Sequence, residues 1–394
     1  MIQLSPFTLA RVPEIHFGPG KLAGLPQLIG RYGHRALFVT GSASFVHSEH
    51  HARLREALES AGIDVLRASL SGEPSPEFVD AVAENFRDGR IDCVVGIGGG
   101  SAIDAGKAIS AMLPQEGSVA PFLECFNARK HDGRKLPYLA VPTSSGTGSE
   151  ASGNAVLSQV GQEGYKSSLR HDNFVPDVAL VDPELSLTCP PDITAACGLD
   201  ALTQLLEAYV SGKASPMTDA LALNGLEHVA AGFLLACENG QRDIAARSHM
   251  AYAALLSGIA LANAGLGVVH GFAGPIGGFF PIPHGVVCGT LIGAATRINI
   301  GALRQDSVRN RAALEKYARA GALLSGEAAA SEEDGCEWLL RVLDRWIAAT
   351  GIARLSTYGV TQDDFPRILE RSNNKNSPIA LPREQMQAIL EARL

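Results

Sequence analysis

The sequence predicts an α/β domain with a parallel sheet, followed by an all-helical domain. Three observations lead to this fold class. Strand and helix patterns alternate up to about residue 185, the strand pattern disappears after about residue 190, and the chain of 394 residues is long enough for two domains. We place the domains at residues 1–187 and 188–394, because the Pro- and Asp-rich stretch DPELSLTCPPD lies between the two patterns.

Five short β-rich runs define the first domain. They are ALFVT (36–40), IDVLRASL (63–70), IDCVVGIGGG (91–100), LPYLAVPTS (136–144) and DVALVDP (177–183). Stretches with helical spacing separate the first three runs, and each of these stretches ends at a glycine, as helices often do. Strand–helix–strand alternation implies parallel pairing with right-handed crossovers. A continuously apolar strand such as CVVGIG suits a sheet that is covered on both faces.

The second half shows only helical spacing. The expected helices lie at 190–212, 215–240, 248–268, 311–324, 332–350 and 363–371. The stretch from Ser248 to Thr296 contains no Asp, Glu, Lys or Arg, and its segment 251–269 is long enough to cross a bilayer. Small residues dominate that segment, and Ser257 and Asn263 interrupt it, so we interpret it as a buried helix and expect no membrane association.

Composition excludes several classes of protein. Hydrophobic residues make up 46% of the chain and charged residues 19%, against a usual charged share of about 25%, which excludes a disordered protein. The net charge of −8 and the absence of a Lys/Arg run argue against nucleic acid as a partner. Seven scattered cysteines without a CxxC pair indicate a reducing compartment, and no signal peptide pattern is seen, so we expect a cytoplasmic protein.

The first chemical signal is the run GGGS at residues 98–101, between a predicted strand and the predicted helix AIDAGKAISAML. Glycine lets a phosphate approach the backbone, and a helix N-terminus offers free N–H groups to an anion. The run therefore suggests a pyrophosphate site, although a tight structural turn would have the same sequence. It is neither a Gly-x-Gly-x-x-Gly fingerprint nor a Walker sequence.

A second loop, TSSGTGSE at residues 143–150, also follows a predicted strand. Its hydroxyl groups can donate hydrogen bonds to phosphate and ribose, but an ordinary surface linker has a similar composition. Two such loops at strand ends support each other, because ligands of open α/β sheets bind at the carboxyl ends of the strands.

The third signal lies in the helical half. Asp200 and Gln204 share one face of a predicted helix, and His270 and His284 stand in a Gly/Pro-rich segment. One carboxylate, one amide oxygen and two imidazoles can enclose Fe²⁺, Zn²⁺, Co²⁺ or Mn²⁺. The alternative is that each histidine is a core or capping residue and that Asp200 caps its helix.

Together these pieces resemble the iron-containing (group III) alcohol dehydrogenase family. The matching motifs span most of the chain and are IHFGPGKL, GIGGGSAIDAGKA, VPTSSGTGSE, PDVALVDPEL, GLDALTQLLEAY and the PHG around His284. The resemblance implies an N-terminal domain that binds NAD or NADP, a helical C-terminal domain and an active site in the cleft between them. It also implies a divalent metal, with Fe²⁺ expected and Zn²⁺ as the alternative, and a homodimer or higher homo-oligomer.

The resemblance also assigns individual residues. Its cofactor contacts are Gly98, Gly99, Gly100, Ser101, Asp104, Thr143, Ser144, Thr147 and Lys166. Asp200, His270 and His284 fall on three of the four metal positions and are the expected catalytic residues. In the implied reaction the metal polarises the oxygen of an alcohol or of an aldehyde or ketone, and a hydride passes between the substrate carbon and the nicotinamide. No dedicated general base is evident.

Two departures from the family pattern concern the metal and the substrate. The fourth metal position, usually His, is Gln204, whose neutral amide oxygen is a weaker donor. A further His that the family commonly carries is replaced by Gly274, so the pocket should be roomier there. We expect the apolar or small residues from Phe272 to Phe280 to line a pocket for an aliphatic or modestly polar substrate.

A third departure concerns the cofactor. The family often carries an Asp after the first strand, where its charge repels a 2′-phosphate, and here that residue is Gly41. Ser42 and Ser44 follow and can hydrogen-bond a phosphate, so NADP joins NAD as a candidate.

Two alternative functions stay open at this point. One is a metal-independent reductase or a lyase on the same fold, similar to maleylacetate reductase or dehydroquinate synthase. The apolar GFAGPIGGFFPIP segment argues against the lyase, which needs a more polar pocket. The other is a nucleotide-binding protein that has lost its metal, which the Gln204 and Gly274 changes suggest.

Overall fold

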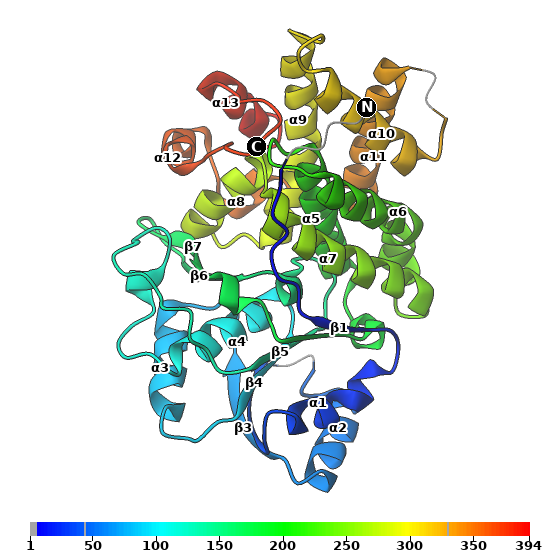
Figure 1. The fold of residues 1–394 in the computed structure, drawn as a ribbon. Helices are drawn as coiled ribbons and strands as arrows, with labels where there is room; N and C mark the ends of the chain where they lie inside the picture. Colours follow the sequence, from blue (N-terminus) through cyan, green and yellow to red (C-terminus); the bar gives the residue numbers. More distant parts are fainter. Residues whose placement is uncertain (1–5, 43–44, 329–330) are drawn as a thin grey trace.

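The computed structural model describes residues 6–42, 45–328 and 331–394 as a sheet-containing lobe and a helical lobe (Figure 1). In the described part of the chain, six strands form a parallel sheet in the order β1-β8-β5-β4-β2-β3. They are β1 Glu14–Phe17, β2 Arg35–Gly41, β3 Asp64–Leu70, β4 Cys93–Gly98, β5 Tyr138–Pro142 and β8 Val178–Val181. The predicted α/β domain with a parallel sheet is confirmed, and among the six strands of this sheet the sequence did not predict the short edge strand β1.

Helices cover both faces of this sheet. They are α1 Leu25–Gly30, α2 Glu49–Ser60, α3 Pro76–Phe86 and α4 Gly100–Met112. Leu37 and Val39 of β2 belong to the core that contains α3 and α4, whereas Phe38 belongs to the core that contains α1 and α2. Neighbouring residues of β2 thus point to opposite, equally buried faces, which is why the strands read as continuous apolar runs.

The strand order reverses between β2 and β4. β2 has β3 on one side and β4 on the other, and it pairs in parallel register with both, for example Thr40 with Ser69 and with Ile97. A reversal of this kind leaves a crevice at the carboxyl ends of the two diverging strands. Gly41 and Gly98 end these strands, so both lie at the crevice.

An antiparallel hairpin, β6 Asn154–Gln159 and β7 Tyr165–Arg170, lies between the sheet and the helical lobe (Figure 1). The sequence did not predict it, because YKSSLR has few of the β-branched and aromatic residues that mark strands. Tertiary contacts hold it instead. Lys107 of α4 donates to the carbonyl of Asn154 at 2.7 Å, and Val156 N–H donates to Asp104 at 3.0 Å.

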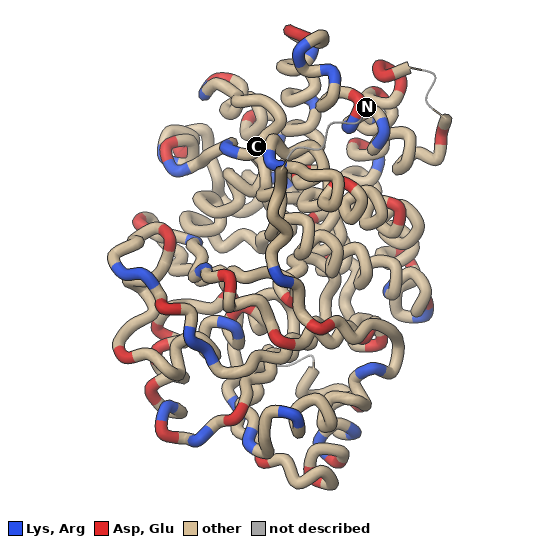
Figure 2. The backbone as a smooth tube through the Cα atoms, viewed as in Figure 1, with Lys and Arg blue, Asp and Glu red and all other residues tan. Residues whose placement is uncertain are grey.

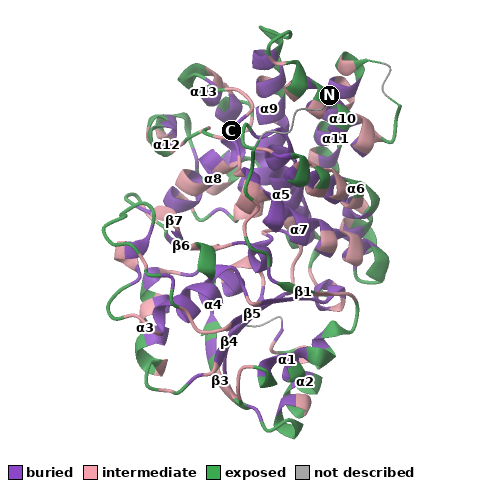
Figure 3. Cartoon of the chain, in the orientation of Figure 1, coloured by how far each residue is buried: buried purple, intermediate pink, exposed green. Residues whose placement is uncertain are grey.

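The second half of the described chain is helical throughout, as predicted. Its helices are α5 Pro191–Val210, α6 Pro216–Asn239, α7 Ile244–Ala264, α8 Val268–Phe279, α9 His284–Arg304, α10 Arg311–Ser325, α11 Glu332–Thr350, α12 Phe365–Arg371 and α13 Arg383–Glu391. α5 runs through the centre of this lobe and is buried along nearly its whole length (Figure 3). The domain boundary between residues 187 and 188 stays a prediction; it lies between the 3₁₀ turn Pro183–Ser186 and α5.

Among the described residues, three helices are long and apolar enough to cross a membrane, namely α6, α7 and α9. In the most apolar window of α7, 67% of the residues are buried inside the protein, and in that of α9 the share is 78%. Figure 2 shows the charged residues on the outer turns of both lobes and few in the centre of the helical lobe. These two helices therefore serve as core helices, in line with the interpretation of the segment 251–269.

Local sequence rules argue against a helix at α8, because the segment contains Pro275 and several glycines. Two of these glycines allow other backbones to approach closely. A Cβ at Gly271 would lie 1.7 Å from the carbonyl oxygen of Asn373, and one at Gly278 would lie 2.8 Å from the Cα of Tyr165. Packing against β7 and the 373–377 segment thus overrides the low helix propensity of this stretch.

The two lobes meet at a contact between glycines. Gly148, in the loop after β5, has a φ of 60° and lies against Gly258 of α7. A Cβ at Gly258 would lie 2.1 Å from the carbonyl oxygen of Gly148 and 2.9 Å from its Cα. These neighbours are backbone atoms, so they cannot move aside without shifting the loop.

We therefore expect Gly258→Ala to lower the free energy of unfolding by about 1–3 kcal/mol, as overpacking of a closed contact does. Gly301→Ala on α9 is the matched control, since no atom lies within 4 Å of its added Cβ, and it should stabilise the protein by about 0.5–1 kcal/mol. Urea and thermal unfolding curves measure both effects. Equal stability of the two variants would contradict this account of the lobe contact.

Candidate metal centre and cofactor crevice

Three helices bring the predicted metal ligands together. Asp200 lies in the middle of α5 and is only 1% exposed. His270 lies in the first turn of α8, and His284 is the first residue of α9. Cys288 follows one turn after His284, so the two side chains share a face of α9. The site is thus assembled from segments up to 88 residues apart in the sequence, 200 to 288.

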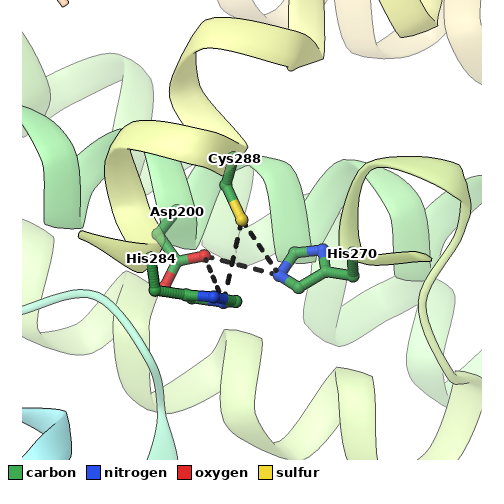
Figure 4. Close-up of side chains that lie close together, drawn as sticks. All are labelled: Asp200, His270, His284 and Cys288. Atoms are coloured by element: carbon green, nitrogen blue, oxygen red, sulfur yellow. Dashed lines mark hydrogen bonds and ion pairs between the residues drawn. The ribbon is translucent and has the colours of Figure 1, made fainter. Parts of the chain in front are cut away.

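The four side chains point at one another (Figure 4). The Oδ1 atom of Asp200 lies 3.4 Å from His270 Nε2 and 3.7 Å from His284 Nε2. The sulfur of Cys288 lies 3.6 Å from His270 Nε2 and 3.7 Å from His284 Nε2. All four donor atoms are within 4.8 Å of one another.

These separations fit a single divalent cation. Zinc bond lengths imply donor separations of about 3.4 Å between nitrogen and oxygen and about 3.6 Å between nitrogen and sulfur in a tetrahedral site. The buried Oδ1 of Asp200 also has no hydrogen-bond partner within the described residues. A carboxylate oxygen in that position is costly unless a cation or donor reaches it, so the chemistry of the donor set suits a metal.

Glu207 orients His270 from the side opposite the cluster. Its Oε2 lies 2.7 Å from His270 Nδ1, and its Oε1 accepts a hydrogen bond from Val269 N–H at 2.7 Å. The carboxylate therefore satisfies the free N-terminal end of α8 and directs His270 Nε2 toward Asp200. Carboxylate–histidine pairs of this kind commonly support metal-binding imidazoles.

The prediction that Gln204 can supply a fourth donor stays a prediction, and hydrogen bonds engage its amide in this structure. The amide oxygen of Gln204 accepts a hydrogen bond from Ser257 at 2.6 Å, and its amino group donates to Asp200 Oδ2 at 3.1 Å. The oxygen that would bind a metal is therefore engaged with α7, and the amide instead supports the carboxylate of Asp200. Among the described His, Cys, Asp and Glu side chains, Cys288 joins Asp200, His270 and His284 in the cluster, and Gln204 lines the cavity beside them.

Burial shapes the electrostatics of this cluster. Burial alone would raise the pKa of Asp200, but the facing His284 and His270 hold it below its usual value and keep the carboxylate ionised. Burial raises the pKa of the Cys288 thiol to about 12. Burial opposes protonation of His270, but the facing Cys288, Asp200 and Glu207 outweigh it and raise the pKa of His270 well above its usual value.

A cavity of about 570 Å³ connects this cluster to the sheet lobe. His270 and His284 line it from the helical lobe, and Gly100, Ser101 and Thr147 line it from the two loops at the sheet. The size lies within the range of small-molecule and cofactor sites. The glycine loop and the metal-ligand candidates therefore face a common space.

The loop at residues 98–101 has the form of an anion cradle. Gly98 has a φ of 156°, and its added Cβ would lie 2.6 Å from Ala102 Cβ. A Cβ at Gly100 would lie 2.5 Å from Thr147 Cγ2, so only glycine allows the two loops to approach. Helix α4 begins at Gly100 without a side-chain cap, which leaves its first N–H groups for a ligand. These features fit the diphosphate of a dinucleotide.

The other predicted cofactor residues surround this loop. Thr143 N–H donates to Gly98 O at 2.8 Å, and Ser144 Oγ would lie 3.4 Å from a Cβ on Gly99. The amide nitrogen of Gly41 would lie 3.5 Å from a Cβ on Gly98. Ser42 follows Gly41 and is exposed, whereas Ser44 lies outside the described residues.

Asp104 has a different environment from the one expected for a direct cofactor contact. Its carboxylate accepts hydrogen bonds from Ser149 Oγ and from Val156 N–H, so it ties the second loop to the hairpin, although it also lines the cavity. Beside it, burial lowers the pKa of Lys107 to about 8 and raises the pKa of Glu150 to about 7. The prediction that Asp104 lines the cofactor stays a prediction, and both its oxygens are engaged by the protein.

Lys166 reaches the cavity from β7 and is paired there. Its Nζ donates to Glu73 Oε1 at 2.5 Å, and Glu73 also accepts from Ser158 at 2.9 Å. Burial opposes ionisation of Glu73, but the charge of Lys166 outweighs it and lowers the pKa of that carboxyl. The cationic head of Lys166 is thus held at a defined place in the cavity wall.

The expected apolar pocket wall is only partly found. Gly274 and Pro275 line the cavity, and a Cβ at Gly274 would have its nearest neighbour, Lys166 O, at 3.7 Å, so space is open beside it. Phe272, Ile276 and Phe279 instead lie in the core of the helical lobe. The helical periodicity of α8 explains this correction, because it turns residues three or four apart, such as Phe272, Ile276 and Phe279, to the same inward face.

Three residues of the site were missed from the sequence, namely Glu73, Glu207 and Cys288. Two of them have a local signal, since Glu207 lies one helical turn after Gln204 and Cys288 one turn after His284. Glu73 has none, because its pairing with Lys166 depends on how the hairpin folds back.

Two family models match the chain. The model described as "Iron-containing alcohol dehydrogenase" matches residues 13–183, and "Fe-containing alcohol dehydrogenase family, C-terminal" matches residues 194–394.

Curated relatives and solved structures agree with these models. The chain is 33% identical over 387 residues to "Long-chain-alcohol dehydrogenase 1" of Geobacillus thermodenitrificans, which covers 96% of this chain and 95% of that protein. It is 31% identical over 397 residues to "NADPH-dependent butanol dehydrogenase" of Clostridium saccharobutylicum, covering 98% and 97%. A crystal structure of 1,3-propanediol oxidoreductase superposes with a TM-score of 0.86 at 31% identity, covering 99% of this chain and 100% of that one. The chain therefore belongs to the iron-containing alcohol dehydrogenase family, whose members interconvert alcohols with aldehydes or ketones, and it is an oxidoreductase of that type.

Proposed function

We propose that the enzyme transfers a hydride between a nicotinamide cofactor seated on the 98–101 loop and a small substrate held over Asp200, His270 and His284. The cavity carries this proposal, because residues of the glycine loop and both histidines line it together. Hydride transfer requires the two reactants to meet in one enclosed space, and holding them in order lowers the barrier.

Each group of residues has a separate task in this proposal. A divalent cation bound there supplies Lewis-acid polarisation of the substrate oxygen. Asp200 contributes the negative charge that retains the cation, and Glu207 keeps Nε2 of His270 directed toward it. The 98–101 and 143–149 loops bind and orient the dinucleotide, and Asp104 positions the second loop against the hairpin.

The family and the cavity support a choice of metal ion and of substrate class. Fe²⁺ is the ion that the resemblance implies, and Zn²⁺ is the alternative. The cavity wall carries both signs of charge, with Glu73, Lys166 and Arg371 among its members, and we propose a small, modestly polar aldehyde or alcohol as the substrate. Free cysteines at all seven positions support a cytoplasmic enzyme, and the resemblance supports a homodimer or higher homo-oligomer.

We propose that the enzyme uses NADP as well as NAD. Gly41 ends β2 beside Gly98 and carries no charge that would repel a 2′-phosphate. The relative at 31% identity named an NADPH-dependent butanol dehydrogenase supports this assignment.

We expect Asp200→Asn to remove the bound metal and to lower kcat/KM by about 100-fold or more, because it deletes the central charge while keeping the shape of the side chain. Elemental analysis of the purified protein and a cofactor-absorbance assay over alcohols and aldehydes measure the two effects. Full activity without metal dependence would instead favour a metal-independent reductase. Cofactor binding without turnover in the metal-loaded wild type would favour a degenerate nucleotide-binding protein.

Glu207→Gln should weaken metal affinity by about 10- to 100-fold while the protein remains folded. The amide oxygen can still accept from Val269, but the charge that fixes His270 is lost. Competition with a chelator measures the affinity, and exposed Glu227→Gln on α6 is the matched control. Unchanged affinity in both variants would argue against a positioning role for Glu207.

Gly41→Asp should lower kcat/KM with NADPH at least tenfold relative to NADH, since the new carboxylate faces the 2′-phosphate. Gly41→Ala is the steric control, because no atom lies within 4 Å of its added Cβ. Steady-state assays with both cofactors test the change in ratio. The same ratio in the Asp and Ala variants would show that this position does not read the 2′ group.

A further inference from the structure

The metal cluster contains a donor that the family pattern does not include. Cys288 is fully buried, and its sulfur lies 3.6 Å from His270 Nε2 and 3.7 Å from His284 Nε2. It stands one helical turn after His284, so both side chains reach the same point from one face of α9. This position results from the helix geometry and does not depend on a loop.

The side chain that would normally complete the cluster is occupied elsewhere. The oxygen of Gln204 accepts from Ser257, and its amino group donates to Asp200 Oδ2. The other oxygen of Asp200, Oδ1, is buried, has no hydrogen-bond partner among the residues described, and faces both imidazoles. Asp200, His270 and His284 thus offer three donors, and the sulfur of Cys288 is the fourth atom of the group.

We infer that Cys288 is the fourth protein ligand of the metal, and that this donor set prefers Zn²⁺ or Co²⁺ to Fe²⁺. The inference rests on the proposed metal site and specifies its chemistry.

Ligand softness supports this assignment. Among the divalent ions that imidazole and carboxylate bind, a thiolate favours Zn²⁺. On binding, the Cys288 S–H bond is replaced by a sulfur–metal bond, and its proton leaves to solvent.

The test uses the full-length protein, stripped of metal and loaded with one equivalent of Co²⁺. The wild type should show the near-ultraviolet sulfur-to-cobalt charge-transfer band together with the visible ligand-field bands. Cys288→Ser should lose the charge-transfer band, keep ligand-field bands, and bind Co²⁺ and Zn²⁺ at least tenfold more weakly. Gln204→Ala should retain the charge-transfer band, because its amide is not a ligand in this assignment.

Cys336→Ser is the matched control. Cys336 is likewise fully buried, but its sulfur donates to the carbonyl of Leu314 in a different core cluster. The charge-transfer band and the metal affinities of Cys336→Ser should equal those of the wild type. Competition between Zn²⁺ and Fe²⁺ under anaerobic conditions gives a second readout, in which the preference of the wild type for Zn²⁺ should fall at least tenfold in Cys288→Ser.

The outcomes separate this inference from the proposed function. Stoichiometric Co²⁺ binding without a charge-transfer band in the wild type would overturn the role of Cys288 and leave the metal site standing, whether or not Cys288→Ser folds. A charge-transfer band that persists in a folded Cys288→Ser protein would also overturn the role of Cys288 and leave the metal site standing. Failure of the wild type to bind Co²⁺ any better than Asp200→Asn would overturn both the ligand assignment and the metal-assisted function.

Discussion

The structure of this enzyme centres on one buried carboxylate oxygen to which no described residue donates a hydrogen bond. Asp200 Oδ1 lies on the central helix of the helical lobe, out of contact with water, and faces two imidazole nitrogens. A buried anion of this kind is stable only beside a cation. The helices around it are arranged accordingly, since α8 and α9 each present a histidine to it and Glu207 fixes the start of α8.

The cofactor crevice depends on a second constraint, the close approach of backbones. The strand order reverses beside β2, and the loops that follow β4 and β5 meet there because glycines of the first loop leave room for Ser144 and Thr147 of the second. Another pair of glycines, Gly148 and Gly258, allows the second loop to lie against the helical lobe. One set of glycines therefore shapes the anion cradle, and another sets the distance between the two lobes.

The departures from the family pattern are linked through this geometry. Gln204 donates to Asp200 and accepts from Ser257. Cys288 lies beside the imidazoles, one turn from His284. Gly274 leaves space in the cavity next to the backbone of Lys166. In the assignment that we propose, these changes alter the metal preference and the shape of the pocket and leave Asp200, His270 and His284 in place.

The sequence by itself determined the fold class and the family, and it predicted most residues of the candidate site, because these depend on local patterns. Apolar runs and glycine-terminated helices indicate the parallel sheet. Asp200, His270 and His284 stand in short motifs that can be recognised in the sequence. Only the tertiary structure decided the hairpin at β6 and β7, the helical state of the segment around Pro275, and the hydrogen bonds that engage the amide of Gln204. Each of these results from contacts between distant segments: Lys107 reaching Asn154, Gly271 lying against Asn373, and Ser257 capturing the oxygen of Gln204. A local sequence pattern reflects the preference of a residue for a helix, strand or turn. Contacts between distant segments depend instead on which groups the folded chain brings within bonding distance.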